Sequence, residues 1–347
     1  MNCSQPQWWA LAALAGATIA YFGLRHILSW LRIRAVAHPN SRSTHTVATA
    51  QGAGIVVMPV AIGITALPFA LDICTSTIAF AGLHGLLAFV AILSLTGLGF
   101  LDDQRPLSII LRLAAQIMTA FLVVFALPSD FRLLPSSLPL LVERIFVVAA
   151  VVWFINLTNF MDGVDLMSAT ETIGIMLGAA ILAVIGAVPP ELGWVAAALL
   201  GAMLGFLPWN TPPARIFLGD AGSLPLGLIL ALVLLHVAAS GHLISALILP
   251  LYYLADTSIT LAHRLVRGER IWEAHREHLY QRAVRGGMSV GRLISYIALT
   301  NAALVVLSTL AALAPTSYAQ HTLLFVAIVV VACTGFSLSR GSVPSRE

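Results

Sequence analysis

Long apolar runs separated by short polar segments make up most of the chain. Runs long enough to cross about 30 Å of hydrocarbon lie roughly at 7–31, 52–71, 78–101, 107–127, 138–156, 168–188, 192–209, 223–240, 243–263, 292–314 and 321–338. In lipid, a helix satisfies all of its own backbone hydrogen bonds. The pattern therefore predicts an all-α, polytopic integral membrane protein, with about eleven transmembrane helices in a single transmembrane domain over residues 1–347.

The arginines are shared unequally between the two sets of connections. Sixteen fall on one predicted side of the membrane, and only Arg132 and Arg144 fall on the other. Basic residues concentrate in cytoplasmic connections. The sequence thus predicts a periplasmic N-terminus and a cytoplasmic C-terminus.

Composition supports the membrane class and excludes several functions. Of the 347 residues, 59% are hydrophobic and 10% are charged, against about 25% charged in soluble proteins. All 18 basic residues are arginine, which excludes chemistry that needs a P-loop or Schiff-base lysine. The net charge of +3 is spread between spans and forms no continuous basic patch, so no nucleic-acid partner is expected.

The chemically distinctive residues gather on the predicted cytoplasmic side. Asn, Asp, His and Arg are concentrated in five inner segments, near 32–51, 101–106, 156–167, 209–222 and 264–291. No large soluble domain is present to carry a site of its own. These segments are therefore expected to form one active site at the cytoplasmic membrane surface.

The most polar of these segments follows an apolar run directly. Asn156, Asn159, Asp162 and Asp165 recur at intervals of three, which on a helical turn places them along one face. A polar helix cap at the membrane surface is the structural alternative. Four such groups beside a membrane helix favour a functional site, because polar groups there are costly.

Carboxylates in two further segments suggest a cation or phosphate site. Asp102 and Asp103 are adjacent at the end of a span, where they repel each other unless a cation lies nearby or one is protonated; neutralisation by Arg105 is the structural alternative. Asp220 lies in a glycine-rich turn that opens a span, so it either serves a phosphate site or merely caps the helix.

The remaining candidates are a buried carboxylate, a histidine pair and an amide. Asp256 lies inside an apolar run, as the partner of an arginine or as a site residue. His275 and His278 share a helix face and either hold a phosphate or metal, or are simply solvated. Asn210 lies among prolines, in a loop that would present its amide rigidly.

The order of these motifs resembles that of a known enzyme family. Arg42-Ser-x-His45, Asp102-Asp103, the segment from Asn156 to Asp165, Phe217-x-Gly-Asp-x-Gly-Ser223 and His275-x-x-His278 follow one another on successive inner segments. This order is similar to that of the polyprenyl-phosphate N-acetylhexosamine-1-phosphate transferases, of the glycosyltransferase 4 type. The resemblance covers about residues 39–282.

The resemblance implies a reaction, its cofactor and its location. Sugar-1-phosphate would pass from a UDP-N-acetylhexosamine to undecaprenyl phosphate and release UMP, with Mg²⁺, or alternatively Mn²⁺, as the cofactor. The protein would be a multi-pass component of the bacterial cytoplasmic (inner) membrane, with its active site on the cytoplasmic face. It would initiate O-antigen or another envelope glycan, and a homodimer is compatible with this.

The resemblance also implies roles for individual residues. It gives the metal site as Asp220 with Asp103, and the catalytic set as Asp102, Asp103, Asp162, His275 and His278. It gives the substrate contacts as Arg42, His45, Asn156, Asn159, Asp165, Asn210 and Phe217, of which Asn210 and Phe217 match the positions that contact uracil.

The sequence also departs from the family pattern. The family reads Asp-Gly-x-Asp-Gly-Leu-Ala, and here Leu166 and Met167 replace Gly-Leu. The first inner loop has Ala48, Ala50, Gln51 and Ala53 where the family has Pro-x-Pro-Arg-Gly-Gly. The segment 275–282 lacks the triple histidine of the peptidoglycan enzyme, which argues against a MurNAc-pentapeptide donor and leaves GlcNAc, QuiNAc and FucNAc.

Two other functions are weighed against this one. A secondary transporter would place its carboxylates near mid-membrane on broken helices, whereas here only Asp256 lies deep in a span. A catalytically silent family member would also be consistent with Leu166 and the altered first loop.

Overall fold

The computed structural model describes residues 5–37, 47–70, 82–134, 138–270 and 275–340. Its helices are α1 (Pro6–Arg34), α2 (Gly54–Ala70), α3 (Gly82–Gln104), α4 (Ile109–Ala126), α5 (Leu140–Met161), α6 (Met167–Val184), α7 (Pro190–Asn210), α8 (Asp220–Val237), the π-helix η1 (Ala238–His242), α9 (Leu243–Ile248), α10 (Leu251–Val266), α11 (Leu279–Arg285), α12 (Val290–Leu313) and α13 (Ser317–Arg340). Within the described residues the only strands are β1 (Val36–Ala37) and β2 (Thr49–Ala50), which pair antiparallel. The all-α prediction is confirmed apart from this small hairpin.

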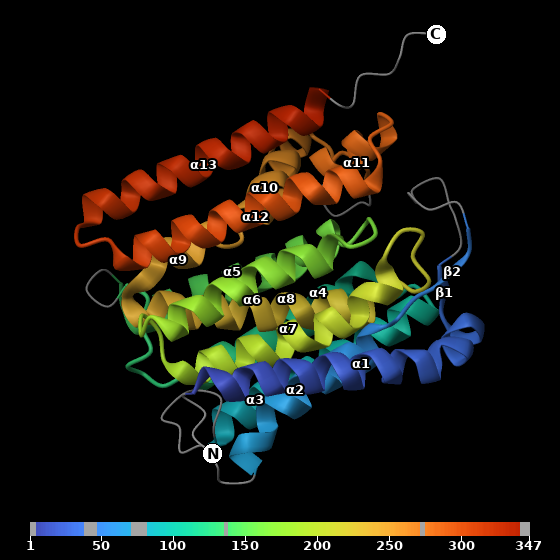
Figure 1. Cartoon of the computed structure of the whole chain (residues 1–347), viewed down its shortest axis with the longest axis horizontal. Coiled ribbons are helices and arrows are strands. Elements are labelled where there is room, and N and C mark those ends of the chain that lie inside the picture. Colours follow the sequence, from blue (N-terminus) through green and yellow to red (C-terminus); the bar gives the residue numbers. More distant parts are fainter. Residues whose placement is uncertain (1–4, 38–46, 71–81, 135–137, 271–274, 341–347) are drawn as a thin grey trace.

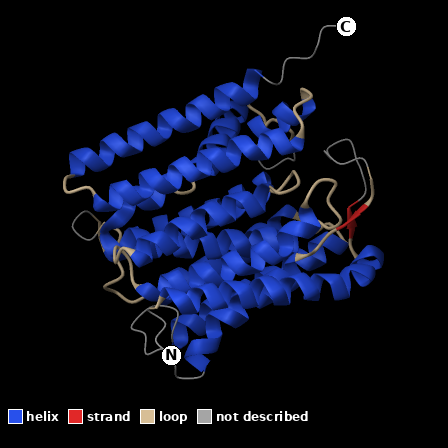
Figure 2. Cartoon of the chain, in the orientation of Figure 1, coloured by secondary structure: helices blue, strands red, loops and turns tan. Residues whose placement is uncertain are grey.

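The helices form a bundle in which the long members run side by side (Figure 2). The helices α12 and α13 lie along one edge, and α1 to α3 lie along the opposite edge (Figure 1). Helix α8 is central. In the most apolar 18-residue segment of Asp220–Ile248, 94% of the residues are buried, whereas 22% are buried in the corresponding segments of α1 and α13. A helix that is apolar all round belongs in such a core.

The number of membrane crossings differs from the prediction. Nine helices of the described residues are long and apolar enough to cross a membrane, and α2 adds the shorter apolar stretch Gly54–Pro68. The chain is therefore a polytopic membrane protein, but the prediction of eleven spans is wrong. The difference arises mainly in the predicted runs 223–240 and 243–263, which do not correspond to two separate helices.

Several shorter helices replace that pair of runs. Helix α8 and η1 extend from Asp220 to a non-helical kink at Gly241 (φ +91°), and α9 follows it to Ile248. Pro250 then separates α9 from α10, because proline cannot continue a helix. Helix α10 has 16 residues and spans about 24 Å at 1.5 Å per residue, which is too short to cross the hydrocarbon alone.

The segments with polar motifs meet at one end of the bundle. The hairpin, the turn after α5, the loop before α8 and helix α11 all lie at the right-hand end in Figure 1.

The two arginines of the other predicted side have structural partners. Arg132 pairs with Glu143 at 2.7 Å, and Arg144 donates to the carbonyl oxygens of Val124 and Phe131 at 3.1 and 3.0 Å.

Two close backbone contacts fix the parts of the site. Helices α3 and α8 touch at Gly99, where an added Cβ would lie 2.1 Å from the carbonyl oxygen of Asp220. The first inner loop docks on the loop before α8, where Phe217 N–H donates to the carbonyl of Ala50 at 2.8 Å and Ala53 N–H donates back to Phe217 at 3.1 Å. Residues far apart in the sequence thus share one surface.

Candidate active site

A cavity of about 200 Å³ lies at the motif-bearing end of the bundle. Its walls come from the hairpin region, the end of α3, the end of α5 with the turn that follows, and the start of α8. The lining residues are Ala37, Gln51, Asp103, Asn159, Asp162, Gly163, Val164, Asp165, Asn210, Phe217, Leu218, Gly219 and Asp220. Four carboxylates and three amides therefore face one small volume.

The Asp103 side chain caps the central helix. Its Oδ1 accepts from the backbone N–H of Asp220 at 2.9 Å, and its Oδ2 accepts from Ala221 N–H at 3.1 Å. A carboxylate suits this place, because the first N–H groups of a helix lack intrahelical partners. Gly219 (φ +72°) permits the contact, since an added Cβ there would lie 2.4 Å from Asp103 Oδ2. Both oxygens of Asp103 thus accept backbone N–H groups, and its role as a metal ligand stays a prediction.

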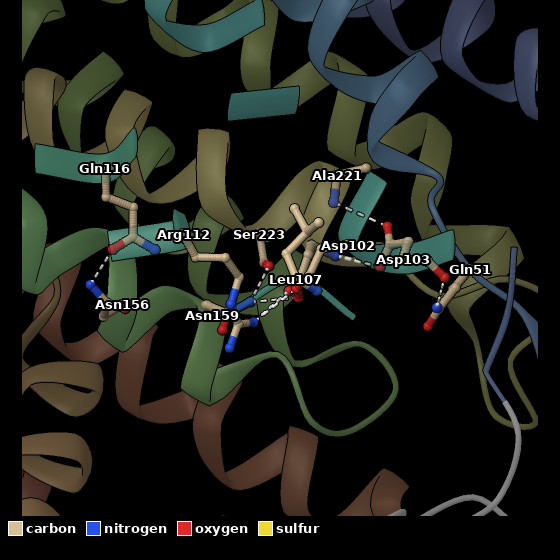
Figure 3. Close-up of polar contacts among 11 residues, drawn as sticks. Gln51, Asp102, Asp103, Leu107, Arg112, Gln116, Asn156, Asn159, Ala221 and Ser223 are labelled. Atoms are coloured by element: carbon tan, nitrogen blue, oxygen red, sulfur yellow. Dashed lines mark hydrogen bonds and ion pairs between the residues drawn. The ribbon is translucent and has the colours of Figure 1, made fainter. Parts of the chain in front are cut away.

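A single arginine nitrogen bridges two of the acidic groups (Figure 3). Arg112 Nη1 lies 2.8 Å from Asp102 Oδ2 and 3.2 Å from Asp220 Oδ2. Asp102 Oδ1 also accepts from Leu107 N–H. Arg112 therefore supplies the cation that the acidic pair was expected to need, whereas the structure shows no ion pair for Arg105 within its described part.

Asn156, Asn159, Asp162 and Asp165 form a polar ladder, and its two amides face different neighbours (Figure 3). Asn159 Nδ2 donates to Asp220 Oδ1 at 2.7 Å and to Ser223 Oγ at 2.8 Å. Asn156 Nδ2 donates to Gln116 Oε1 at 2.6 Å, deeper in the bundle. Asn159 thus lines the cavity and Asn156 does not. The prediction that the ladder lies along one helical face is wrong, because α5 ends at Met161, before its two aspartates.

Asp162 leaves the helix as the residue that follows α5. Its Oδ1 accepts from Ser168 Oγ, in the first turn of α6, at 2.6 Å. Burial raises the pKa of Asp162 to about 7, the hydrogen bond from Ser168 lowers it, and the negative charges of Asp220 and Asp165 raise it. A carboxyl with a pKa near neutrality can exchange a proton during turnover.

The predicted nucleotide contacts are held by the loop before α8. Asp165 Oδ2 accepts from Ala214 N–H at 3.1 Å. Asn210 Oδ1 accepts from Leu166 N–H at 2.7 Å, and Asn210 Nδ2 donates to the carbonyl of Ile216 at 3.1 Å. The amide of Asn210 therefore ties the α5–α6 turn to the loop. Phe217 lies in the same wall of the cavity.

The histidine pair belongs to a neighbouring cluster. His278 is 2% exposed, and its Nδ1 lies 3.3 Å from Asp256 Oδ1. Asp256 also accepts from Leu279 N–H at 2.9 Å, at the start of α11, and from the hydroxyls of Tyr252 and Thr260. Within the described residues no arginine pairs with it, so the arginine alternative is not supported there. Neither His275 nor His278 lines the cavity; their catalytic role stays a prediction.

Two contacts connect that cluster with the ladder. The rings of Phe160 and His278 are 6.3 Å apart, and Tyr280 Oη donates to the carbonyl of Phe160 at 2.9 Å. The pKa of His275 is lowered to about 4 by burial, by His278 and by Arg264, so its ring is neutral at pH 7. The segment between α10 and α11 is further held by ion pairs of Glu277 with Arg264 and Arg267.

Other residues of the site were missed or lie outside the described part of the chain. Arg42 and His45 lie outside the described residues. Arg112, Gln116 and Ser168 were not predicted as site residues. Arg112 carried a usable signal, because an arginine inside an apolar run is costly and tends to be functional. Gln116 and Ser168 are ordinary polar residues of spans, and only the fold reveals their partners.

The donor set around the cavity suits Mg²⁺. In the part of the chain that the structure describes, no three His, Cys, Asp or Glu side chains cluster as a metal site. Mg²⁺ is often held by only one or two carboxylates and completes its shell with phosphate oxygens and water. Asp220 and Asp162 face one cavity and offer such carboxylates. Asp103, which caps α8, lines the same cavity.

Comparison with known proteins places the chain among glycosyltransferases. Residues 83–238 match the model of Glycosyl transferase family 4. That range runs from α3 to the end of α8 and includes Asp102, Asp103, the ladder and Asp220. The match thus covers every carboxylate of the cavity, whereas the first loop and the 264–291 loop lie outside it.

Curated relatives cover most of the chain at low identity. The decaprenyl-phosphate N-acetylglucosaminephosphotransferase of Mycobacterium leprae (strain TN) is 28% identical over 327 residues, which cover 83% of this chain and 80% of that protein. The probable undecaprenyl-phosphate N-acetylglucosaminyl 1-phosphate transferase of Bacillus subtilis (strain 168) is 28% identical over 272 residues, which cover 75% and 72%.

A third relative matches a smaller part of the chain. The phospho-N-acetylmuramoyl-pentapeptide-transferase of Kocuria rhizophila is 31% identical over 241 residues, covering 55% of this chain and 63% of that protein. Together these similarities confirm the family recognised from the order of the motifs, and they favour an enzyme over a secondary transporter.

Proposed function

We propose that this chain, whose residues 83–238 match glycosyl transferase family 4, transfers N-acetylhexosamine-1-phosphate from a UDP-sugar to undecaprenyl phosphate and releases UMP. The observation that carries the proposal is the arrangement around Asp220. Its carboxylate lies between the amide of Asn159 and the guanidinium of Arg112, at a cavity lined by further carboxylates. Phosphoryl transfer needs such positioned charges more than it needs covalent chemistry.

An apolar groove supports a polyprenyl acceptor. A groove of about 220 Å³ lies between α5, α8, α9 and α10. Trp153 and Phe154 of α5 line it, one turn before Asn156 and Asn159. The same helix thus presents an apolar wall and then polar groups. An isoprenoid chain in this groove would place its phosphate toward the ladder.

The reaction follows from these placements. A phosphate oxygen of the lipid attacks the sugar-bearing phosphorus of the donor, and the bond from that phosphorus to the bridging oxygen breaks, so that UMP leaves with the oxygen. A phosphate monoester has a second pKa of about 6, so the lipid phosphate is already largely dianionic at neutral pH. A strong general base is therefore not required.

The chain's own residues orient the reacting phosphates. Asp220 and Asp162 would hold Mg²⁺, which would neutralise negative charge on the diphosphate. Arg112, held by Asp102, would be available to a phosphate oxygen when Asp220 serves as a metal ligand. Asn159 would keep Asp220 oriented. Phe217 and the Asn210–Leu166 contact would shape the wall that receives the uridine.

The finer features of the proposal come from the relatives and the arginine distribution. The names of the two relatives that cover most of the chain specify N-acetylglucosamine phosphate transfer, so UDP-GlcNAc is the first donor to test, beside UDP-QuiNAc and UDP-FucNAc. The arginine bias supports a cavity on the cytoplasmic face of the bacterial inner membrane. The product would initiate O-antigen or another envelope glycan.

The test is a donor panel with purified protein. The protein in lipid nanodiscs receives undecaprenyl phosphate, Mg²⁺ and each UDP-N-acetylhexosamine in turn, and UMP is measured by chromatography. We expect UMP with at least one donor, none in EDTA, and none from Asp220→Asn. If no donor releases UMP, the enzyme is catalytically silent and the proposal fails.

A further inference from the structure

The first turn of α6 carries a hydroxyl that meets the cavity's own aspartate. Ser168 Oγ donates to Asp162 Oδ1 at 2.6 Å, and Ser168 is 2% exposed. The family pattern Asp-Gly-x-Asp-Gly-Leu-Ala has alanine at this position, which cannot make the bond. Ser168 is therefore a feature of this chain, beside the replacements at Leu166 and Met167.

We propose that Ser168 is a positioning residue, whose hydroxyl fixes the Asp162 carboxylate so that one oxygen is held and the other is left for the donor or its metal. Within the described residues, Ser168 is the only hydrogen-bond partner of the carboxylate, through Oδ1 alone. Asp162 itself lines the cavity. The inference rests on the proposed function, since it assigns the second oxygen to that reaction.

The backbone around Asp162 does not fix the side chain by itself. Asp162 follows α5 with φ −84° and ψ 40°, and its N–H donates to the carbonyl of Asn159 at 3.3 Å. That bond places the main chain and leaves the two side-chain torsions free. A carboxylate that can rotate spends only part of its time in the productive orientation, and misplacement of a reacting group by about 1 Å can cost about 100-fold in rate.

The charges near Asp162 make it useful for the Ser168 hydroxyl to act as a clamp, which holds the Asp162 carboxylate in one orientation. Asp220, Asp165 and Asp103 all repel its negative charge. Repulsion from several sides would turn the carboxylate away from the cavity. The Ser168 hydroxyl is a donor on the protein side that opposes this.

A neighbouring hydroxyl provides a matched control. Thr172 lies one turn deeper on α6, is fully buried, and donates to the carbonyl of Ser168 at 2.6 Å. This bond stays within the helix and does not touch the cavity. Loss of the Thr172 hydroxyl therefore reports how α6 tolerates the removal of a buried hydroxyl, without any effect on Asp162.

The kinetic test compares hydroxyl removals in the full-length enzyme. For Ser168→Ala we expect kcat for UMP release to fall about 10-fold, as for one lost charge-assisted hydrogen bond, with KM for the donor unchanged within about 2-fold. Ser168→Thr keeps a hydroxyl and should recover most of kcat. Thr172→Val should behave as wild type. Equal losses in Ser168→Ala and Thr172→Val would overturn the proposal.

A double substitution separates positioning from support of the fold. In an Asp162→Ala background, Ser168→Ala should cause no further loss of residual UMP release, because the group that it positions is absent. A further loss of about 10-fold in that background would show that Ser168 acts elsewhere, and would overturn the proposal.

A spectroscopic titration gives a readout that does not need turnover. The carboxyl band of Asp162, identified by subtraction of an Asp162→Asn spectrum, should titrate at higher pH in Ser168→Ala, because the donor that stabilises the ionised form is gone. An unchanged midpoint overturns the clamp. An inactive wild-type protein with the expected shift would instead overturn the proposed function alone.

Discussion

Asp103 and Asp220 meet through the first turn of α8, where Asp103 Oδ1 accepts a hydrogen bond from the backbone N–H of Asp220 at 2.9 Å. The second oxygen holds the next N–H, that of Ala221, at 3.1 Å. The carboxylate that ends α3 thus fixes the start of the helix that carries Asp220. A substitution at residue 103 is therefore expected to change the orientation of Asp220 in the cavity.

The first prediction concerns this cap. Asp103→Asn keeps one acceptor but turns a donor toward the second backbone N–H, so we expect a loss of stability of about 1–2 kcal/mol together with reduced UMP release. Thermal unfolding in detergent measures the first effect. Asp130→Asn, on an exposed turn at the other end of the bundle, is the control and should change neither. Full stability with lost activity would instead mean that Asp103 acts directly on substrate.

The second prediction concerns the bridge made by Arg112. Since Nη1 alone contacts both Asp102 and Asp220, an ammonium can replace it in part. We expect Arg112→Lys to keep UMP release within about 10-fold of wild type, and Arg112→Gln to lose about 100-fold or more, because two carboxylates are left without their cation. Arg105→Gln, an exposed arginine at the same end, should remain near wild type. Equal losses in the Lys and Gln variants would contradict a role as a point charge.

The sequence predicted the helical membrane architecture because apolar runs report lipid exposure and helix length together. The prediction of the number of spans failed because apolar runs do not report where a helix is kinked or interrupted. The runs 223–240 and 243–263 look like two spans, yet the described chain continues from Asp220 to Ile248 as one kinked stretch and restarts after Pro250. The non-helical φ of +91° at Gly241 and the break at Pro250 are local backbone features, and a hydropathy pattern does not report them.

The sequence predicted many residues of the candidate site, but it did not predict which hydrogen bonds they make. Spacing alone indicated that Asn159, Asp162 and Asp165 belong together, and all three line the cavity. Spacing could not indicate that Asn156 pairs with Gln116. Partner choice depends on which helices become neighbours, so pairs such as Ser168 with Asp162 emerge only from the fold.

The third prediction tests the turn between α5 and α6. Leu166 has φ +67°, a left-handed conformation that costs a residue with a side chain about 1–2 kcal/mol and costs glycine little. The family pattern has glycine here. We expect Leu166→Gly to raise the melting temperature, while the N–H of residue 166 still donates to Asn210.

A leucine in regular helix supplies the matched comparison for that turn. Leu204 lies on α7 and is 42% exposed, so Leu204→Gly should lower stability by about 1 kcal/mol through loss of helix propensity. The two substitutions are chemically identical and should have opposite signs. A lower melting temperature in both would show that the Leu166 side chain contributes more by packing than its backbone loses by strain.

The last prediction is a pH dependence that belongs to Asp162. Its pKa in the folded protein is about 7, above the ordinary value of 3.8, because burial and the neighbouring aspartates disfavour its charge. Between those two values the folded state binds the proton more tightly than the unfolded state, so stability falls as the pH rises through this window and levels off above it. In Asp162→Asn, residue 162 carries an amide, which does not titrate in this pH window. In EDTA, we expect the melting temperature of the wild type to fall more than that of Asp162→Asn between about pH 5 and about pH 8. Parallel curves for the two proteins would show that Asp162 carries no such proton.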